Sequence, residues 1–151
     1  MIRLATHDDI PALIECGRRF HAEAGVLDEV GAKFSPERLR STLAGLVEQY
    51  DKACVVVAEK DGAIIGGAAA LAYPSFFSDT MSAQELFWWI DPAHRGATTA
   101  LRMLWMLEQW AGSAGCQTLT MVAIAIPDSP ASRIYLRQGF KVLEAHFVKE
   151  L

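Results

Sequence analysis

Apolar and polar positions along the first fifty residues alternate first with the period of a strand and then with that of a helix. The opening MIRLA reads as a short strand. Thr6 and Asp9 then form the pattern of a helix N-cap, and Gly25 is the expected end of that helix. Ser35-Pro36 predicts the start of a second helix, because serine caps helices and proline is favoured at the first helical position. The apolar positions of the two helices are Ile10, Leu13, Ile14, Cys16 and Phe20, and Leu39, Leu43, Leu46 and Val47.

The pattern changes at Ala53, where β-branched residues begin. Residues 54–60 and 63–73 predict two strands, and Asp61-Gly62 between them is a strong hairpin signal. Residues 84–91 predict another strand, closed by Pro92. A helix is expected over residues 96–114; because it is apolar nearly all round, it should lie buried against a sheet.

The last part of the chain predicts two more strands and a short helix. Residues 118–126 are apolar enough for a buried strand, and Ser129-Pro130 starts a helix that Gly139 ends. Residues 140–148 predict the final strand. The element order is therefore β-α-α-β-β-β-α-β-α-β, which predicts one domain over residues 1–151 with a mixed sheet and helices on both faces, in the α/β or α+β class.

Composition and charge exclude several classes of protein. The chain has 151 residues, of which 52% are hydrophobic and 21% charged, which fits one globular domain. No apolar run reaches the roughly 20 residues of a membrane span. An acidic pair stands where a signal peptide needs its apolar core, so we expect no export and a cytoplasmic location. The net charge of −4 argues against non-specific nucleic-acid binding and is compatible with a cationic substrate.

Cysteines and histidines show no pattern of a metal or redox site. Cys16, Cys54 and Cys116 are far apart and form no CxxC pair, so buried structural thiols are expected. The four histidines lack the HxxxH and HExxH spacings. We therefore expect no metal ion.

Residues 90–111 contain a strand end, a turn of small residues and the start of a long buried helix. Backbone N–H groups without partners and a partial positive charge make a helix N-terminus suitable for phosphate. Small residues from Gly96 to Ala100 would let a diphosphate approach the backbone, and Arg95 could add a charged contact. An ordinary strand–turn–helix connection with a surface arginine explains the same pattern.

Residues 128–140 place Tyr135 in the middle of a short helix. A tyrosine there is commonly part of the core. Thioester aminolysis would give the phenol a chemical role, because a hydroxyl can protonate or stabilise the departing thiolate.

Together the two segments resemble the GNAT superfamily of acetyl-CoA-dependent N-acetyltransferases. The family pattern R/Q-x-x-G-x-G/A is read here as residues 95–100, and N-x-x-A-x-x-x-Y-x-x-x-G-F as Asp128, Ala131, Tyr135, Gly139 and Phe140. The resemblance covers nearly the whole chain. It implies a central, mostly antiparallel mixed sheet of about six strands with four helices on both faces. It also implies transfer of an acetyl group from acetyl-CoA to a primary amine of a small molecule or protein.

The resemblance further implies the roles of individual residues. Tyr135 would be the general acid at the sulfur, and Glu85 is the candidate general base. Backbone groups near Trp89 and Ile90 would pair with the pantetheine arm of coenzyme A. The residues expected at the diphosphate or nearby parts of the cofactor are Arg95, Gly96, Ala97, Thr98, Thr99, Ala100, Asp128 and Ala131.

Three departures from the family pattern stand out. Thr98 replaces the central glycine, which would be strained if that position needed a positive φ. Asp128 replaces the frequent asparagine, and a carboxylate there would repel phosphate. The chain also ends after one strand beyond Phe140, so the acceptor site would be open or completed by a partner, and a homodimer through that strand is an alternative.

Two other functions remain open from the sequence. Thr98 and Asp128 favour a non-catalytic acyl-CoA-binding module. Phe87, Trp88 and Trp89, together with the apolar residues 74–77, favour a structural or assembly protein if they are exposed. The identity of the acceptor amine is not encoded in any pattern.

Overall fold

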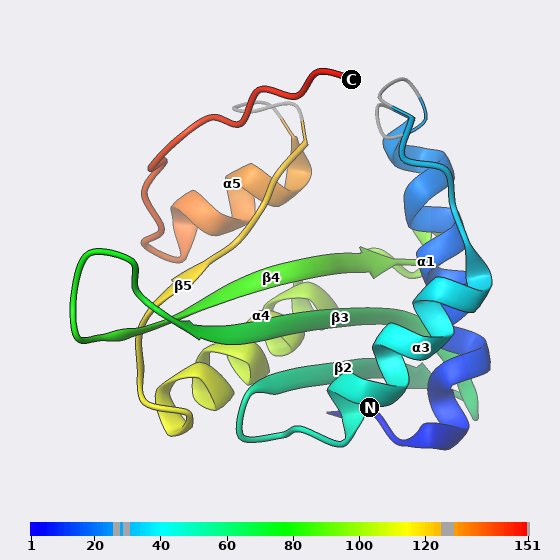
Figure 1. Ribbon diagram of the computed structural model, residues 1–151. Coiled ribbons are helices and arrows are strands. Elements are labelled where there is room, and N and C mark those ends of the chain that lie inside the picture. Colours follow the sequence, from blue (N-terminus) through cyan, green and yellow to red (C-terminus); the bar gives the residue numbers. More distant parts are fainter. Residues whose placement is uncertain (26–27, 29–30, 125–128, 151) are drawn as a thin grey trace.

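A five-stranded sheet forms the centre of the molecule in the part of the chain that the computed structural model describes, residues 1–25, 28, 31–124 and 129–150. Its strands lie in chain order and are antiparallel, except that β4 and β5 are parallel. Figure 1 shows β2, β3, β4 and β5 side by side in this order. The strands are β1 (Ile2–Leu4), β2 (Ala53–Lys60), β3 (Ala63–Pro74), β4 (Met81–Ile90) and β5 (Cys116–Thr120).

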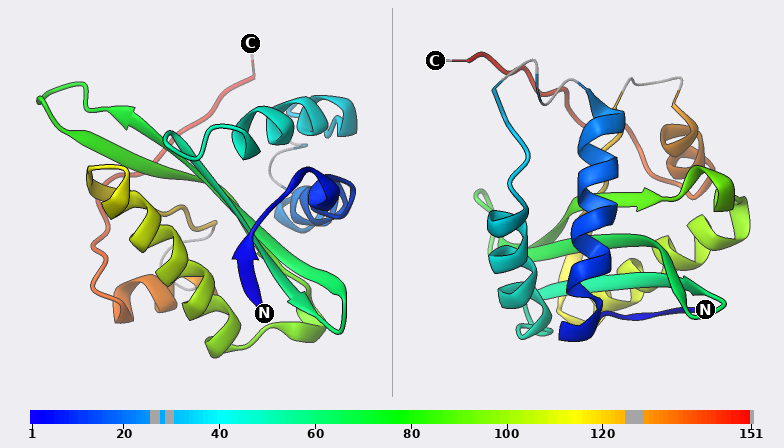
Figure 2. Two further views of the ribbon diagram at one scale, coloured as in Figure 1. Left: turned by 90° about the horizontal axis from the view of Figure 1, so that it is seen from below. Right: turned by 90° about the vertical axis from the view of Figure 1, so that its right-hand side faces the viewer.

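Helices cover both faces of the sheet, as the sequence predicts. One face packs against α1 (Ile10–Ala24) and α3 (Pro36–Val47), and the opposite face against α4 (Ala97–Ser113). The short helix α5 (Pro130–Arg137) lies on the same side as α4 (Figure 2). Two 3-10 turns, His7–Asp9 and Pro92–His94, lead into α1 and α4. The mixed, mostly antiparallel sheet with helices on both faces is confirmed.

Short-range signals in the sequence account for the element boundaries. The Asp9 carboxylate accepts from the Thr6 amide at 2.8 Å, and the Ser35 hydroxyl accepts from the Arg38 amide at 3.2 Å, so both predicted caps form. Asp61 and Gly62 have φ of 51° and 78°, the pair of positive values that a type I′ hairpin turn needs. These predictions are confirmed.

β4 has two irregularities that shape its surroundings. Ala69 pairs with Phe87 but Ala70 pairs with Glu85, so Leu86 has no partner on β3 and forms a bulge. On the other edge, pairing with β5 covers only residues 81–84 of β4. Beyond that point the two parallel strands separate, and the second half of β4 has a free edge in the described structure.

The predictions for the last two strands are wrong in part. β5 is half-exposed and ends at Thr120, where residues 118–126 were expected to form a buried strand; residues 125 and 126 lie outside the described part. Residues 140–150 leave α5 as an irregular segment, so the sheet has five described strands and not six. Apolar and polar residues alternate over residues 140–148 as they do in a strand. A strand also needs a hydrogen-bonding neighbour, and this segment has none in the described structure.

The aromatic residues divide between core and surface. Phe87 and Trp89 are buried among α1, α3 and the sheet, which is a core role. Phe76 and Phe77, in the β3–β4 loop, are each 91% exposed and stack edge-on at 4.9 Å. Among the described residues, no helix is long and apolar enough to cross a membrane.

Candidate active site

Glu85 lies where β4 and β5 begin to separate, and it is only 5% exposed. Its Oε2 accepts from the backbone amide of Val122 at 2.9 Å and from the hydroxyl of Tyr135 at 3.4 Å. Burial raises the pKa of this carboxyl to about 7, although its two hydrogen bonds act in the opposite direction. A carboxyl with that pKa can both accept and release a proton near neutral pH.

Tyr135 reaches this carboxylate from α5. Its ring packs against Trp88 at 5.5 Å and Phe140 at 5.7 Å between ring centroids. The hydroxyl has two acceptors, Glu85 and the Val122 carbonyl at 3.2 Å. Burial, and then the nearby Glu85 charge, raise the pKa of Tyr135 well above its usual range, so the phenol stays protonated. The two residues therefore form a buried hydroxyl–carboxyl pair.

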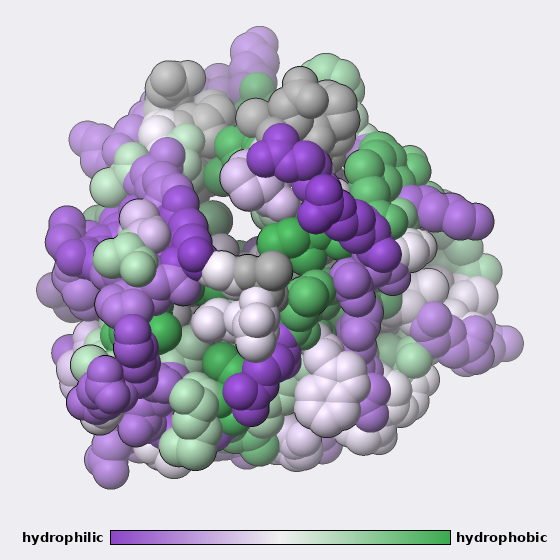
Figure 3. Space-filling view, turned by 180° about the vertical axis from the view of Figure 1, so that it is seen from behind, coloured by the Kyte–Doolittle hydropathy of each residue, from purple (hydrophilic) through white to green (hydrophobic). Residues whose placement is uncertain are grey.

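The free edge of β4 presents backbone groups beside this pair. The amide of Asp91 donates to the Ile65 carbonyl on β3, so Trp88 and Ile90, of the opposite parity, direct their N–H and C=O groups away from β3. The Ile90 carbonyl accepts from Nε of Arg95 at 2.8 Å. Viewed from behind, the molecule is hollowed next to this part of β4, between the sides that carry α5 and α1 (Figure 3).

The turn after β4 ends in an uncapped helix N-terminus. Asp91 closes the preceding turn by accepting from the Ala93 amide at 2.9 Å. Gly96 is the N-cap of α4, no side chain caps the helix, and its first turn has no acidic residue. The helical ladder starts with Ala100 donating to Gly96, so the three earlier amides have no partner within the helix. Thr98 is exposed and lies inside α4 without a positive φ, so the expected backbone strain is not present.

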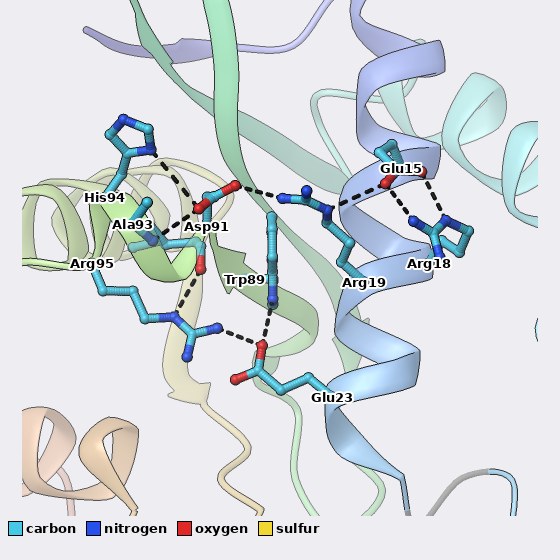
Figure 4. Close-up of polar contacts among 10 residues, drawn as sticks. Glu15, Arg18, Arg19, Glu23, Trp89, Asp91, Ala93, His94 and Arg95 are labelled. Atoms are coloured by element: carbon cyan, nitrogen blue, oxygen red, sulfur yellow. Dashed lines mark hydrogen bonds and ion pairs between the residues drawn. The ribbon is translucent and has the colours of Figure 1, made fainter.

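A polar network joins this turn to α1 (Figure 4). Glu23 accepts from Nη2 of Arg95 and, at 2.9 Å, from the indole N–H of Trp89. Arg19 pairs with Asp91 and lies over the Trp89 ring at 5.6 Å from its centre. Arg95 thereby holds the turn in place through Glu23 and the Ile90 carbonyl.

Comparison with known sequences identifies the family of this fold. The sequence model of the Acetyltransferase (GNAT) family matches residues 24–140, more than two thirds of the chain. The chain belongs to this family. The comparison with curated proteins gives no match.

Solved structures that resemble this GNAT domain cover nearly its full length. The ribosomal-protein-alanine N-acetyltransferase of Brucella melitensis superposes with a TM-score of 0.73 at 16% identity, over 100% of this chain and 99% of its own. An aminoglycoside acetyltransferase from an uncultured soil metagenomic sample gives 0.75 at 20%, over 100% and 95%. A predicted acetyltransferase of Clostridium acetobutylicum, solved with acetyl-CoA, gives 0.74 at 19%, over 98% and 94%. At these identities the likeness shows the shared fold.

The GNAT fold brings the predicted residues into two groups. Glu85 and Tyr135, fifty positions apart in the sequence, meet at 3.4 Å. Trp89 and Ile90 precede the turn that carries Arg95 and residues 96–100, and Ala131 lies half-buried in the first turn of α5. The side chain of Ala97 and the whole of Asp128 lie outside what the structure describes. The role of Glu23 is not visible in the sequence, because no local pattern links it to Arg95, 72 positions later.

Cysteine chemistry does not enter this site. Cys16 and Cys54 are buried, and burial raises the pKa of the first thiol to about 11 and of the second to about 12. Both are therefore protonated at neutral pH, as expected of structural thiols. Within the described ranges, no group of three or more His, Cys, Asp or Glu side chains is arranged to hold a metal ion.

Proposed function

We propose that the chain is an N-acetyltransferase that moves an acetyl group from acetyl-CoA to a primary amine by direct attack on the thioester. Membership of the GNAT family supports acetyl transfer in general. The observation that carries the finer proposal is the buried contact between Glu85 and Tyr135, at the point where β4 and β5 separate. It places a proton acceptor and a proton donor in direct contact.

The contact allows one proton path for both halves of the reaction. A primary ammonium has a pKa of about 10.4 in water and must lose a proton before it can attack. That first proton leaves to solvent. As the C–N bond forms and the C–S bond breaks, the attacking nitrogen gives a second proton to Glu85, directly or through water, and Tyr135 gives its hydroxyl proton to the departing sulfur. Protonated Glu85 then returns a proton to Tyr135, so that one proton is released to solvent overall and no covalent enzyme intermediate is needed.

The first turn of α4 fits the diphosphate of the co-substrate. Acetyl-CoA would supply the activated thioester when it is bound. The residues of this chain would bind and orient it. Three unpartnered amides, no capping side chain and no acidic residue in that turn together favour an anion. The Trp88 backbone groups and the Ile90 N–H, which point away from β3, support pairing with an amide-containing arm.

The similar structures do not identify the acceptor of this chain. One of them is named for alanine of a ribosomal protein and another for aminoglycosides. These two acceptors differ in size and charge, so the shared fold favours neither for this chain.

Calorimetric titration with acetyl-CoA, followed by an assay of thiol release with a panel of amines, tests the proposal. Binding together with amine-dependent thiol release is expected. Binding without release on any amine would leave a non-catalytic acyl-CoA-binding module. No heat at any concentration would remove the enzyme assignment and leave a structural protein with this fold.

Tyr135→Phe should lower kcat by about 10-fold to 100-fold with little change in acetyl-CoA affinity, because only the proton at the sulfur is lost. The phenyl ring keeps its packing against Trp88 and Phe140. Since the Tyr135 hydrogen bond lowers the pKa of Glu85, its loss should also move the acidic limb of the kcat profile to higher pH. If neither kcat nor the acidic limb of its pH profile changed, Tyr135 would have no part in the reaction.

A further inference from the structure

The loop between β3 and β4, residues 75–80, carries two aromatic side chains that the rest of the molecule does not cover. Phe76 and Phe77 are each 91% exposed, and their rings contact each other edge-on at 4.9 Å between centroids. The amide of Ser75 donates to the carbonyl of Thr80 at 2.8 Å and closes the loop. Two adjacent exposed aromatic rings on a closed loop are typical of an interaction surface.

A cleft of about 310 Å³ lies between α1 and α3 over the sheet, on the face opposite α4. Apolar side chains from both helices and from β4 line it, among them Phe20, Leu39 and Phe87. An apolar cavity of about 150 Å³ holds one benzene molecule. The cleft therefore has room for about two phenyl rings, which is the number that the loop exposes.

Charge also matches the loop to the cleft. Every ionisable side chain that lines the cleft is basic: His21, Lys33 and Arg38. The one ionisable side chain of the loop is acidic, Asp79. Among the described residues, neither Asp79 nor the two cations Lys33 and Arg38 form an ion pair. An aromatic loop with a carboxylate and an apolar cleft with basic side chains are complementary surfaces.

The loop does not reach the cleft of its own chain. It joins β4 at Met81, whereas β4 reaches the floor of the cleft at Leu86, five positions further on. At about 3.4 Å per residue, these two points are roughly 17 Å apart. The loop also projects beyond the end of the sheet that α1 and α3 leave uncovered (Figure 1). A loop of this kind in the cleft must therefore come from another molecule.

We propose that two copies of this chain associate, and that the loop of each copy inserts Phe76 and Phe77 into the cleft of the other. The rings lie between α1 and α3 of the second copy, and Asp79 faces Lys33 and Arg38. Because the loop and the cleft are separate surfaces of one chain, a single two-fold axis forms both contacts at once.

The contact area is large enough for a specific dimer. A buried aromatic side chain removes about 150–250 Å² from water. Four rings, two from each copy and each 91% exposed at present, would together bury roughly 550–900 Å². The walls of the two clefts lose a comparable area. The total then exceeds the roughly 1,000 Å² that specific protein interfaces reach.

The association does not involve the candidate active site. Glu85, Tyr135 and the amides at the start of α4 do not line the cleft, and none of them belongs to the loop. Dimer formation and acetyl transfer can therefore be tested separately, and either can fail without the other.

Sedimentation velocity of the unmodified protein over a dilution series should show an equilibrium between monomer and dimer. Phe76→Ser combined with Phe77→Ser should raise the dissociation constant of the dimer at least about 100-fold, because central aromatic anchors dominate interface energies. Trp105→Ser is the matched control: Trp105 is also exposed, at 60%, but it lies on α4 and its loss should not change the dissociation constant. All three side chains are exposed, so the variants should fold, which circular dichroism checks.

A charge exchange tests whether the loop meets the cleft. Asp79→Lys should weaken the dimer about 10-fold, because it brings a cation to Lys33 and Arg38. Adding Lys33→Glu and Arg38→Glu to this variant should restore association. Adding Arg40→Glu instead, an exposed residue of α3 that does not line the cleft, should not restore it.

Three results would overturn the proposal. The first is a protein that stays monomeric at every concentration. The second is a dimer that the serine variants weaken but the charge exchange leaves unchanged, which would mean that the two loops stack on each other. The third is a monomer that sediments with phosphatidylcholine vesicles only when Phe76 and Phe77 are present, which would assign the loop to a membrane surface.

Discussion

Glu85→Gln is expected to lower kcat/KM for acetyl transfer by about 10²-fold to 10⁴-fold, the range for loss of a general base. The amide keeps the size of the side chain and can still accept from the Val122 amide, so the fold should persist. Steady-state kinetics by thiol release measures the effect. Glu108→Gln is the matched control, because burial also raises the pKa of Glu108 but this residue lies on α4. Equal losses in both variants would contradict the role of Glu85.

The pH dependence follows from the same carboxyl. A base works in its deprotonated form, so activity of the unmodified protein should rise with pH through about 7 and then level off, and this limb should be absent in Glu85→Gln. Stability should show the opposite trend. The pKa of Glu85 is higher in the folded protein than the ordinary 4.5, so the folded state holds the proton more tightly. The free energy of unfolding therefore falls between pH 4.5 and about 7, by about 3 kcal/mol at most, and Glu85→Gln should not show this fall.

Thr98→Asp should weaken coenzyme A binding by about 10-fold to 100-fold, because a negative charge would stand at the helix N-terminus where the diphosphate is expected. An acidic residue at this end of α4 otherwise suits the helix dipole, so thermal stability should stay equal or rise slightly. Isothermal titration with coenzyme A measures the affinity, and the loss should shrink as salt is added.

Two controls separate repulsion from damage to the turn. Thr98→Asn has nearly the same shape as the aspartate variant without its charge and should bind coenzyme A close to normally. Acetylpantetheine, which has no diphosphate, should bind both variants alike. If the asparagine variant lost as much affinity as the aspartate variant, charge at this turn would not be the reason.

Signals that act over a few residues were readable from the sequence. The Ser35 cap and the Asp61-Gly62 hairpin each depend on neighbours within four positions, so their residues alone determine the outcome. The same holds for the start of α4 after Pro92. The order of the elements up to α5 and the fold class followed from these local predictions.

Features that depend on distant partners were not readable. Residues 140–148 alternate like a strand, yet no neighbouring strand takes up their hydrogen bonds in the described structure. The burial of Glu85 needs β5 to leave β4 and α5 to fold back over the junction, neither of which is visible in residues 84–91. The role of Glu23 at Arg95 needs the position of α1 on the sheet.

Helix α1 holds the turn before α4 at two points. Arg19 pairs with Asp91, and Glu23, one helical turn later on the same face, accepts from Arg95. Because both contacts come from one segment of one helix, a displacement of that segment would move the beginning and the end of the turn together. The geometry of the first turn of α4 is therefore coupled to the packing of α1 on the sheet.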